Sequence, residues 1–314
     1  MVENRGLHIV LGASGGTGSA IVRELGRRGH RVRAVSRGGQ ASEGAEGMKA
    51  DVSTLEEARA AAEGASVVYH AAQPPYTRWY EEFPPMTDAI AEAAAAAGAK
   101  LVFADNLYMY GPTDGPMTEE TPQRATGKKG RTRILMAGRL LEAHRSGRAR
   151  VAIGRSSDYY GPRGSASVVG DTVFGAAVEG KTVRWPASLE VPHQFNYLPD
   201  MARALLTLGE REEADGEVWH LPAAEPITGR RFLDLLFAEI STTPKVSVTS
   251  RTMVRVAGLF SPFIREFGEN FYQFERPFLA DASKFQGTFG PFEPTPHEEA
   301  IKRTAAWFEE RARG

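Results

Sequence analysis

The chain has 314 residues, with 39 acidic and 38 basic side chains and no cysteine. A net charge of −1 argues against a nucleic-acid or anionic-membrane surface, and the lack of cysteine excludes disulfides, a thiolate nucleophile and a zinc–thiolate site. The length suits one large α/β domain or a core with an added lobe. With no bilayer-spanning apolar run and no signal segment before the first predicted strand, we expect a cytoplasmic enzyme without a membrane partner.

Residues 7–37 predict a β-strand, a glycine-rich turn, a helix over 19–28 and a second strand. The G-x-x-G-x-x-G spacing of the turn lets the backbone bend sharply and approach a pyrophosphate, towards which the helix would direct free N–H groups. An ordinary tight turn is the alternative, but the strand–turn–helix–strand context favours dinucleotide binding. The predicted cofactor contacts here are Gly12, Ser14, Gly15, Gly16, Thr17 and Gly18.

The end of the second strand favours NADP(H) over NAD. In such sites an acid at this place binds the ribose 2′-hydroxyl, whereas a base accommodates the 2′-phosphate. The strand ends in Ser36 and Arg37 without an acid, and the Arg37 guanidinium offers a fork of donors to phosphate. The alternative is a solvated surface arginine. Further predicted cofactor contacts follow the third and fourth strands: Asp51, Val52, Ala71, Ala72 and Gln73.

Strands alternate with helices up to about residue 155, which predicts an α/β fold with a doubly wound parallel sheet. The predicted strands are 7–11, 32–35, 47–50, 67–70, 100–104 and 151–154, and longer helices are predicted at 86–97 and 130–146. Beyond residue 155, proline, glycine and aromatic residues become more frequent. We therefore expect a dinucleotide-binding core at 1–155, to which 188–222 returns through a strand near 216–221, and a discontinuous substrate lobe at 156–187 and 223–314.

The order of these pieces resembles the extended short-chain dehydrogenase/reductases, in particular the NAD(P)-dependent epimerase/dehydratase group. The resemblance covers nearly the whole chain and rests on the glycine turn, residues 51–52, 70–72, 101–111, 155–163 and 195–200, and the segment from 275 to 307. It implies a Rossmann-like fold and a nicotinamide dinucleotide cofactor. It also implies a possible homodimer, since family members often pair through the helices that correspond to 86–97 and 130–146.

The resemblance fails at the catalytic residues. The family uses a Ser or Thr, a Tyr and a Lys, and these positions align here with Asn106, Lys129 and Arg133. No Y-x-x-x-K occurs between residues 105 and 150. If another proton donor has taken over, the candidates are Tyr108, Tyr110, Lys129 and Tyr160, with ordinary packing as the alternative for each tyrosine. Lys129 is also a predicted cofactor contact, and the permanently charged Arg133 would hold the cofactor ribose or phosphate.

The expected substrate is small and carries no nucleotide. Relatives that act on nucleotide sugars hold the diphosphate through an Asn and an Arg, which correspond here to Asp158 and His193. A carboxylate would repel a diphosphate, although a third anion contact is kept as Arg276. Tyr110 is a further predicted substrate contact. The aromatic residues between 260 and 278 suggest an apolar or aromatic molecule under a lid, or simply the core of the lobe.

Three functions remain open at this point. We favour an NADP(H)-dependent oxidoreductase acting on a small non-nucleotide molecule, with the usual catalytic residues replaced. The alternatives are an NADP(H)-binding sensor or scaffold without catalysis, and an epimerase or dehydratase that uses the nicotinamide transiently. The fold alone does not decide among them.

Overall fold

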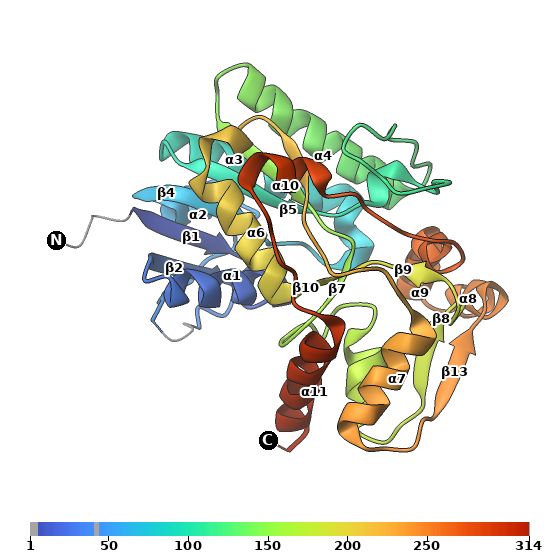
Figure 1. Cartoon of the computed structure of the whole chain (residues 1–314). Coiled ribbons are helices and arrows are strands. Elements are labelled where there is room, and N and C mark those ends of the chain that lie inside the picture. The colour runs from blue at the N-terminus through green and yellow to red at the C-terminus, as the bar shows by residue number, and fades with distance from the viewer. Residues whose placement is uncertain (1–5, 41–43, 314) are drawn as a thin grey trace.

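The computed structural model describes residues 6–40 and 44–313. Its centre is a seven-stranded parallel sheet in the order β11-β6-β5-β4-β1-β2-β3 (Figure 1). The predicted doubly wound sheet is therefore confirmed, including the late strand, which pairs with β6. The strands are β1 (Leu7–Leu11), β2 (Arg31–Ser36), β3 (Glu46–Lys49), β4 (Ala65–His70), β5 (Lys100–Asp105), β6 (Arg150–Arg155) and β11 (Val218–His220).

Helices cover both faces of the sheet, which is why its strands are apolar on both sides. Along β1, Ile9 and Leu11 belong to the core cluster formed with α2 (Leu55–Ala62), α3 (Trp79–Ala96) and α4 (Lys128–Arg145). Val10 belongs to the cluster formed with α1 (Gly16–Arg27) and α6 (Leu198–Glu210). Because successive strand residues point to opposite faces, these two clusters lie on opposite sides of the sheet.

Helix α3 begins at Trp79 rather than at residue 86 as the sequence predicted, and it continues through Pro84 and Pro85. A proline removes one backbone donor and normally interrupts a helix. Here the carbonyls that lose their partners belong to the exposed residues Tyr80 and Glu81, where water can replace the missing bonds. Burial of Trp79 among aromatic residues of the core favours the extra turns.

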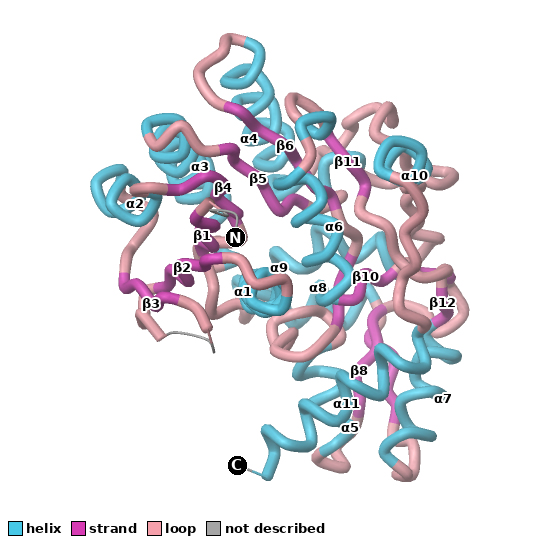
Figure 2. Tube along the Cα trace, turned by 60° about the vertical axis from the view of Figure 1, so that its left-hand side comes forward, coloured by secondary structure: helices cyan, strands magenta, loops and turns pink. Residues whose placement is uncertain are grey.

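A lobe built from short elements extends from the sheet (Figure 2). β7 pairs with β10, β8 with β13 and β9 with β12, around a separate aromatic core. The strands are β7 (Asp158–Tyr160), β8 (Val183–Pro186), β9 (Pro192–His193), β10 (Phe195–Tyr197), β12 (Ile227–Thr228) and β13 (Val246–Thr249). The helices are α5 (Ala176–Val178), α7 (Gly229–Ile240), α8 (Arg251–Gly258), α9 (Pro262–Phe267) and α11 (His297–Arg313), whereas α10 (Ser283–Phe289) contacts β11 of the main sheet.

Short helical turns complete the chain and carry several residues of the site. They are η1 (Tyr76–Arg78) after β4, η2 (Tyr108–Tyr110) after β5, the π-helical η3 (Gly170–Gly175), η4 (Glu212–Ala214) and η5 (Gly268–Phe274). In a doubly wound sheet the ligand crevice lies at the carboxyl ends of the strands, where the strand order reverses. Here that reversal falls between β1 and β4, so η1, η2 and the start of β7 follow the strand ends at which a ligand is expected.

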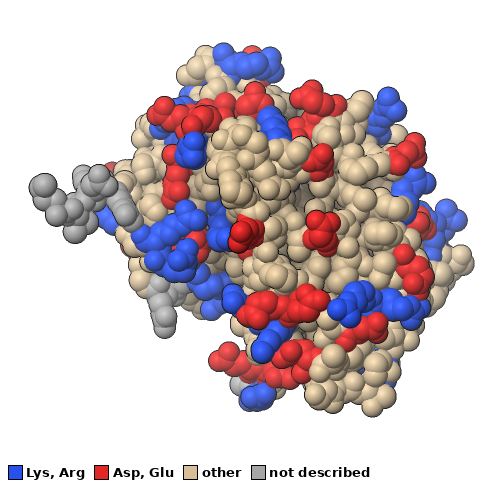
Figure 3. All heavy atoms as spheres, viewed as in Figure 1, with Lys and Arg blue, Asp and Glu red and all other residues tan. Residues whose placement is uncertain are grey.

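Acidic and basic side chains are interspersed over the face drawn in Figure 3, as expected for a nearly neutral chain. Among the described residues, no helix combines the length and the apolar character needed to cross a bilayer.

Candidate functional site

The glycine turn between β1 and α1 has a backbone shape that side chains would prevent. Gly12 has φ +84°, and a Cβ there would lie 2.6 Å from the backbone nitrogen of Ala72. A Cβ on Gly18 would clash with the Gly12 carbonyl, because α1 packs directly against the turn. A Cβ on Gly15 would meet no described atom closer than 3.5 Å, so this side of the turn is open.

Helix α1 begins in this turn, at Gly16, three positions earlier than the sequence predicted. No side chain caps its N-terminus and its first turn contains no acidic residue. Its first N–H groups and the positive end of its dipole therefore face the open side of the turn without a competing anion. Ser14 is exposed and Thr17 half-buried at the same place. These features fit the pyrophosphate of a dinucleotide.

The carboxyl ends of β2 and β3 form the neighbouring part of the crevice. Ser36 is buried and its Oγ accepts a hydrogen bond of 3.1 Å from the N–H of Gly39, whereas Arg37 is exposed. Hydrogen bonds from Ser53 lower the pKa of the Asp51 carboxyl, and the positive charge of Arg37 adds to this effect. The exposed Arg37 guanidinium thus lies beside the predicted adenosine position, where it can donate hydrogen bonds to a phosphate.

The remaining predicted cofactor contacts lie at the same edge of the sheet. Ala71 donates its N–H to the carbonyl of Leu11 at 3.0 Å, which holds the end of β4 beside the glycine turn. Ala72 and Gln73 follow directly, and Val52 is buried after β3. The structure thus brings the predicted cofactor contacts of β1 to β4 to one end of the sheet; their role in binding stays a prediction.

A buried charge network lies where β5 and β6 end. Asp105 accepts hydrogen bonds from Arg133 of α4 at 3.1 Å and from Arg155 of β6 at 3.2 Å. The side chains are 0%, 5% and 1% exposed, respectively, so two guanidinium groups share one carboxylate away from water. Arg133 also stacks on Trp79, with 4.4 Å between its Cζ and the ring centroid. Arg133 is therefore held within the protein, beneath the crevice.

The same network continues to Tyr110 and His220. Arg155 donates to the Tyr110 hydroxyl at 2.8 Å, and that hydroxyl lies 2.7 Å from Nε2 of His220. Burial and the positive charge of Arg155 lower the pKa of His220 to about 4, so the imidazole is neutral. Its Nδ1 faces the carbonyl of Asp281 at 3.1 Å, and Nδ1 therefore carries the proton while Nε2 accepts from Tyr110. The Tyr110 hydroxyl is fully engaged in these contacts.

Lys129, which the sequence analysis placed at the position of the family's catalytic tyrosine, is enclosed. Its Nζ contacts the Tyr76 carbonyl and the Glu266 carboxylate of α9, and lies 4.2 Å from the centroid of the Tyr76 ring. Its backbone N–H donates to Glu269 of η5 at 3.3 Å. Two acids of the lobe thus hold the start of α4. The side chain is 4% exposed, and its ammonium is satisfied by this chain alone.

Tyr108 occupies the position after Asn106 and Leu107 at the end of β5. The Asn106 Oδ1 accepts a 3.1 Å hydrogen bond from the Tyr108 N–H and so fixes the turn η2. Burial raises the pKa of the Tyr108 phenol well above its ordinary value, and the charge of Asp158 raises it further, against a smaller opposing effect of Arg133. The phenol therefore stays protonated at neutral pH and can donate a hydrogen bond, but it is a poor proton shuttle.

Asp158 of β7 and His193 of β9 form a pair in the lobe, with 3.0 Å between Oδ2 and Nε2. Nδ1 of His193 faces the Gln273 carbonyl at 3.1 Å. The histidine side chain is 2% exposed and the aspartate side chain 15%. Two of the residues that the sequence analysis assigned to substrate binding are thus in direct contact with one another.

Two other predicted site residues lie elsewhere. Tyr160 is 1% exposed inside the aromatic core of the lobe, and its hydroxyl lies 2.8 Å from Nδ1 of His297. Arg276 is 48% exposed beside Asp114, 4.0 Å away. The structure does not bring either side chain to the charge network or to Lys129; their predicted roles stay predictions.

The sequence analysis did not select Asp105, Arg155, Tyr76 or Glu266 as site residues. Asp105 and Arg155 lie at corresponding ends of adjacent strands, which strand pairing could have suggested. Glu266 lies 137 positions from Lys129, and no local sequence pattern predicts that pairing.

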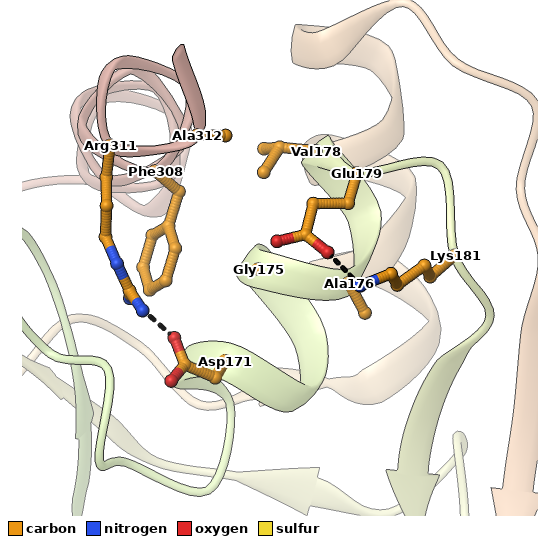
Figure 4. Close-up of a pocket in the computed structure, with 9 residues that line it drawn as sticks. All are labelled: Asp171, Gly175, Ala176, Val178, Glu179, Lys181, Phe308, Arg311 and Ala312. Carbon is orange, nitrogen blue, oxygen red and sulfur yellow. Dashed lines mark hydrogen bonds and ion pairs between the residues drawn. The ribbon is translucent and has the colours of Figure 1, made fainter. Parts of the chain in front are cut away.

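A separate pocket of about 510 Å³ opens between η3, α5 and α11 (Figure 4). The ionic groups that line it are paired with one another: Arg311 with Asp171 at 2.7 Å, and Lys181 with Glu179. None of its lining residues belongs to the crevice described above.

Comparisons with known structures agree with this fold. gox2253 superposes with a TM-score of 0.80 at 22% sequence identity, over 98% of this chain and 99% of its own. MoeE5, solved in complex with UDP-glucose and NAD, gives 0.78 at 20% identity over 98% and 100%. DesIV, a dTDP-glucose 4,6-dehydratase from Streptomyces venezuelae solved with NAD and TYD bound, gives 0.79 at 17% identity over 97% of both chains. Among curated proteins, none matches this sequence.

The family assignment rests on the match of the sequence to a family model. Residues 8–221 match the model of the NAD dependent epimerase/dehydratase family, which spans the glycine turn, the whole parallel sheet and the start of the lobe. The chain belongs to the NAD dependent epimerase/dehydratase family.

Proposed function

We propose that this protein is an NADP(H)-dependent oxidoreductase that acts on a small molecule without a nucleotide. The proposal for the cofactor is supported by the glycine turn, where the open side at Gly15 and the uncapped N-terminus of α1 suit a pyrophosphate. When bound, such a cofactor supplies or accepts a hydride; the protein supplies position and proton transfer.

The observation that supports NADP(H) over NAD is the exposed Arg37 at the end of β2. No acidic residue ends this strand to bind a ribose 2′-hydroxyl. A guanidinium can instead form two parallel hydrogen bonds to a 2′-phosphate, beside the Ser36 hydroxyl. MoeE5 and DesIV were solved with NAD, so this preference would set the present chain apart from them.

The choice of a substrate without a diphosphate is supported by Asp158 and Arg276. The Asp158 carboxylate, next to His193, would face the negative charge of a diphosphate. Arg276, the predicted third anion contact, lies at the surface beside Asp114. A neutral carbonyl or hydroxyl compound avoids this repulsion, and the protonated Tyr108 phenol could orient its oxygen by a hydrogen bond.

The enclosure of Lys129 favours a second candidate, an NADP(H)-binding protein without turnover. The position that carries the catalytic tyrosine in the family is filled here by an ammonium bound to Glu266 and to the Tyr76 carbonyl. Steady oxidation of NADPH with a panel of small carbonyl compounds would favour the oxidoreductase, and tight binding without turnover would favour the second candidate.

Calorimetry with NADP⁺ and NAD⁺ tests the cofactor proposal. We expect NADP⁺ to bind more tightly, and Arg37→Ser to weaken NADP⁺ roughly 10- to 100-fold, about 1.4–2.8 kcal/mol, while NAD⁺ changes less than about threefold. Arg31→Ser is the control, because Arg31 is an exposed cation at the opposite end of β2. Tighter binding of NAD⁺, or an unchanged affinity of Arg37→Ser for NADP⁺, would contradict the proposal.

A homodimer through α3 and α4 remains part of the proposal. The two helices pack side by side and carry the exposed apolar residues Tyr80 and Leu135. Sedimentation equilibrium would measure the mass of the particle directly.

A further inference from the structure

The pair formed by Asp158 and His193 has a hydrogen-bonding environment that fixes where its protons lie. Nδ1 of His193 faces the carbonyl oxygen of Gln273 at 3.1 Å, and a carbonyl can only accept. Nδ1 therefore carries a proton. Nε2 faces Oδ2 of Asp158 at 3.0 Å, and a hydrogen bond there requires a second proton, held on the imidazole or on the carboxyl. The pair thus holds one proton more than a neutral imidazole and a carboxylate do together.

The packing keeps the imidazole in this orientation. Its ring stacks on Phe274 with 4.6 Å between centroids and 2° between the planes, and it contacts Phe195 at 4.5 Å and Phe278 at 5.4 Å. The histidine is shielded from water, whereas the aspartate is the partly exposed member of the pair. A proton that leaves the pair therefore leaves through the carboxyl group of Asp158.

The four phenols on which the charge of Asp158 acts do not exchange protons near neutral pH. Tyr76 of η1, Tyr108 of η2, Tyr159 of β7 and Tyr272 of η5 all lie close enough for the Asp158 charge to act on them. For each, burial is the main effect that raises the pKa of the phenol, to about 12 for Tyr76. These phenols remain protonated hydrogen-bond donors. The nearby cations Lys129 and Arg133 are bound to Glu266 and Asp105.

We propose that Asp158 is the catalytic proton donor and acceptor of the crevice, and that His193 is the positioning residue that supplies its exchangeable proton. The inference rests on the proposed oxidoreductase function. In the reducing direction, a substrate carbonyl carbon gains a hydride from the reduced nicotinamide, which becomes oxidised. The carbonyl oxygen gains the proton through Asp158, the product is an alcohol, and the pair recovers its proton from water.

The substrate class follows from this arrangement. Once it has lost its proton, the Asp158 carboxylate repels a phosphate or a carboxylate, so a neutral oxygen suits this site better. Aldehydes, ketones and the corresponding alcohols carry such an oxygen.

Nitrogen NMR of the histidine side chains, in the protein without cofactor, tests which nitrogens of His193 carry protons. We expect Nδ1 of His193 to carry a proton in the wild type, because it faces the Gln273 carbonyl. In Asp158→Asn the amide can donate to Nε2, and we expect a neutral ring with a proton on Nδ1 only. A wild-type His193 that carries its only ring proton on Nε2 would overturn the proposal, whether or not a substrate is known, because the pair would then hold no additional proton.

Kinetics with NADPH and small carbonyl compounds test the catalytic role. We expect Asp158→Asn and His193→Asn to lower kcat at least about 100-fold and to change the pH dependence of kcat, while the Kd for NADPH stays within about threefold. His297→Asn is the control, because His297 is a buried histidine of the same lobe that contacts Tyr160 and the Glu225 carbonyl instead. An Asp158→Asn variant with wild-type kcat and pH profile would overturn the proposal. Failure of the wild type to bind NADPH would instead overturn the proposed function, and the NMR result would stand independently.

Discussion

The two ends of the crevice are built by different means. At the glycine turn, the shape of the backbone comes from a few adjacent residues, Gly12 to Gly18, and no distant side chain is needed to form it. At the opposite end, the contacts join Asp158 to His193 over 35 positions and Lys129 to Glu266 over 137. The first end forms from neighbouring residues of one motif, whereas the second consists of side chains that pair across long stretches of the chain. A local motif needs only its own segment, but the paired end depends on how distant segments meet.

The largest expected effect concerns the charge network beneath the second end. Asp105→Asn removes the carboxylate that Arg133 and Arg155 share, and leaves two buried guanidinium groups without a counter-charge. We expect a loss of about 3–5 kcal/mol in the free energy of unfolding, measured by urea denaturation. The control is Asp88→Asn, which breaks an exposed pair with Arg139 and should cost less than about 1 kcal/mol. Equal costs for the two variants would mean that this end is not held by its long-range pairing.

A smaller effect concerns the glycine turn, where one substitution should weaken binding without changing stability. Gly15→Ala should fold normally, because the new methyl group meets no described atom closer than 3.5 Å. It should nevertheless weaken dinucleotide binding about 10- to 100-fold, since the methyl group enters the space proposed for the pyrophosphate. Gly26→Ala in the same helix has open space around the added carbon and should leave binding unchanged. Calorimetry and thermal unfolding on the three proteins would show whether the turn binds as proposed.

An effect of similar size concerns His70, at the end of β4 between the two ends of the crevice. Burial, with a further effect of Arg133, lowers the pKa of His70 to about 3, so it stays neutral in the folded protein. The unfolded chain takes up a proton as the pH falls below about 6.5, and the folded protein does not. The stabilisation is therefore present above pH 6.5 and is lost as the pH falls, by about 2 kcal/mol between pH 7 and pH 5.

The variant His70→Gln should lose this part of the pH dependence, while its amide can still bond the Thr87 hydroxyl. Urea denaturation at pH 7, 6 and 5 measures how the free energy of unfolding of each protein depends on pH. The same slope in both proteins would show that other groups cause the loss of stability in acid.

The sequence predicted the parts of the molecule that depend on neighbouring residues. Alternating apolar segments predicted the parallel sheet, and the spacing of glycines predicted the turn after β1. The predicted start of this helix at residue 86 was wrong, because α3 begins at the buried Trp79 and continues through Pro84 and Pro85. The sequence placed Lys129 beside the crevice, but its pairing with Glu266 depends on how the lobe folds back, which no local pattern encodes.

The position of β11 has a consequence for how the chain is made. This strand, residues 218–220, covers an edge of β6 that would otherwise expose unpaired backbone groups, and it is the last strand of the sheet to leave the ribosome. We therefore expect a chain that ends before β11 to leave these backbone groups of β6 unpaired and available to a strand of another molecule.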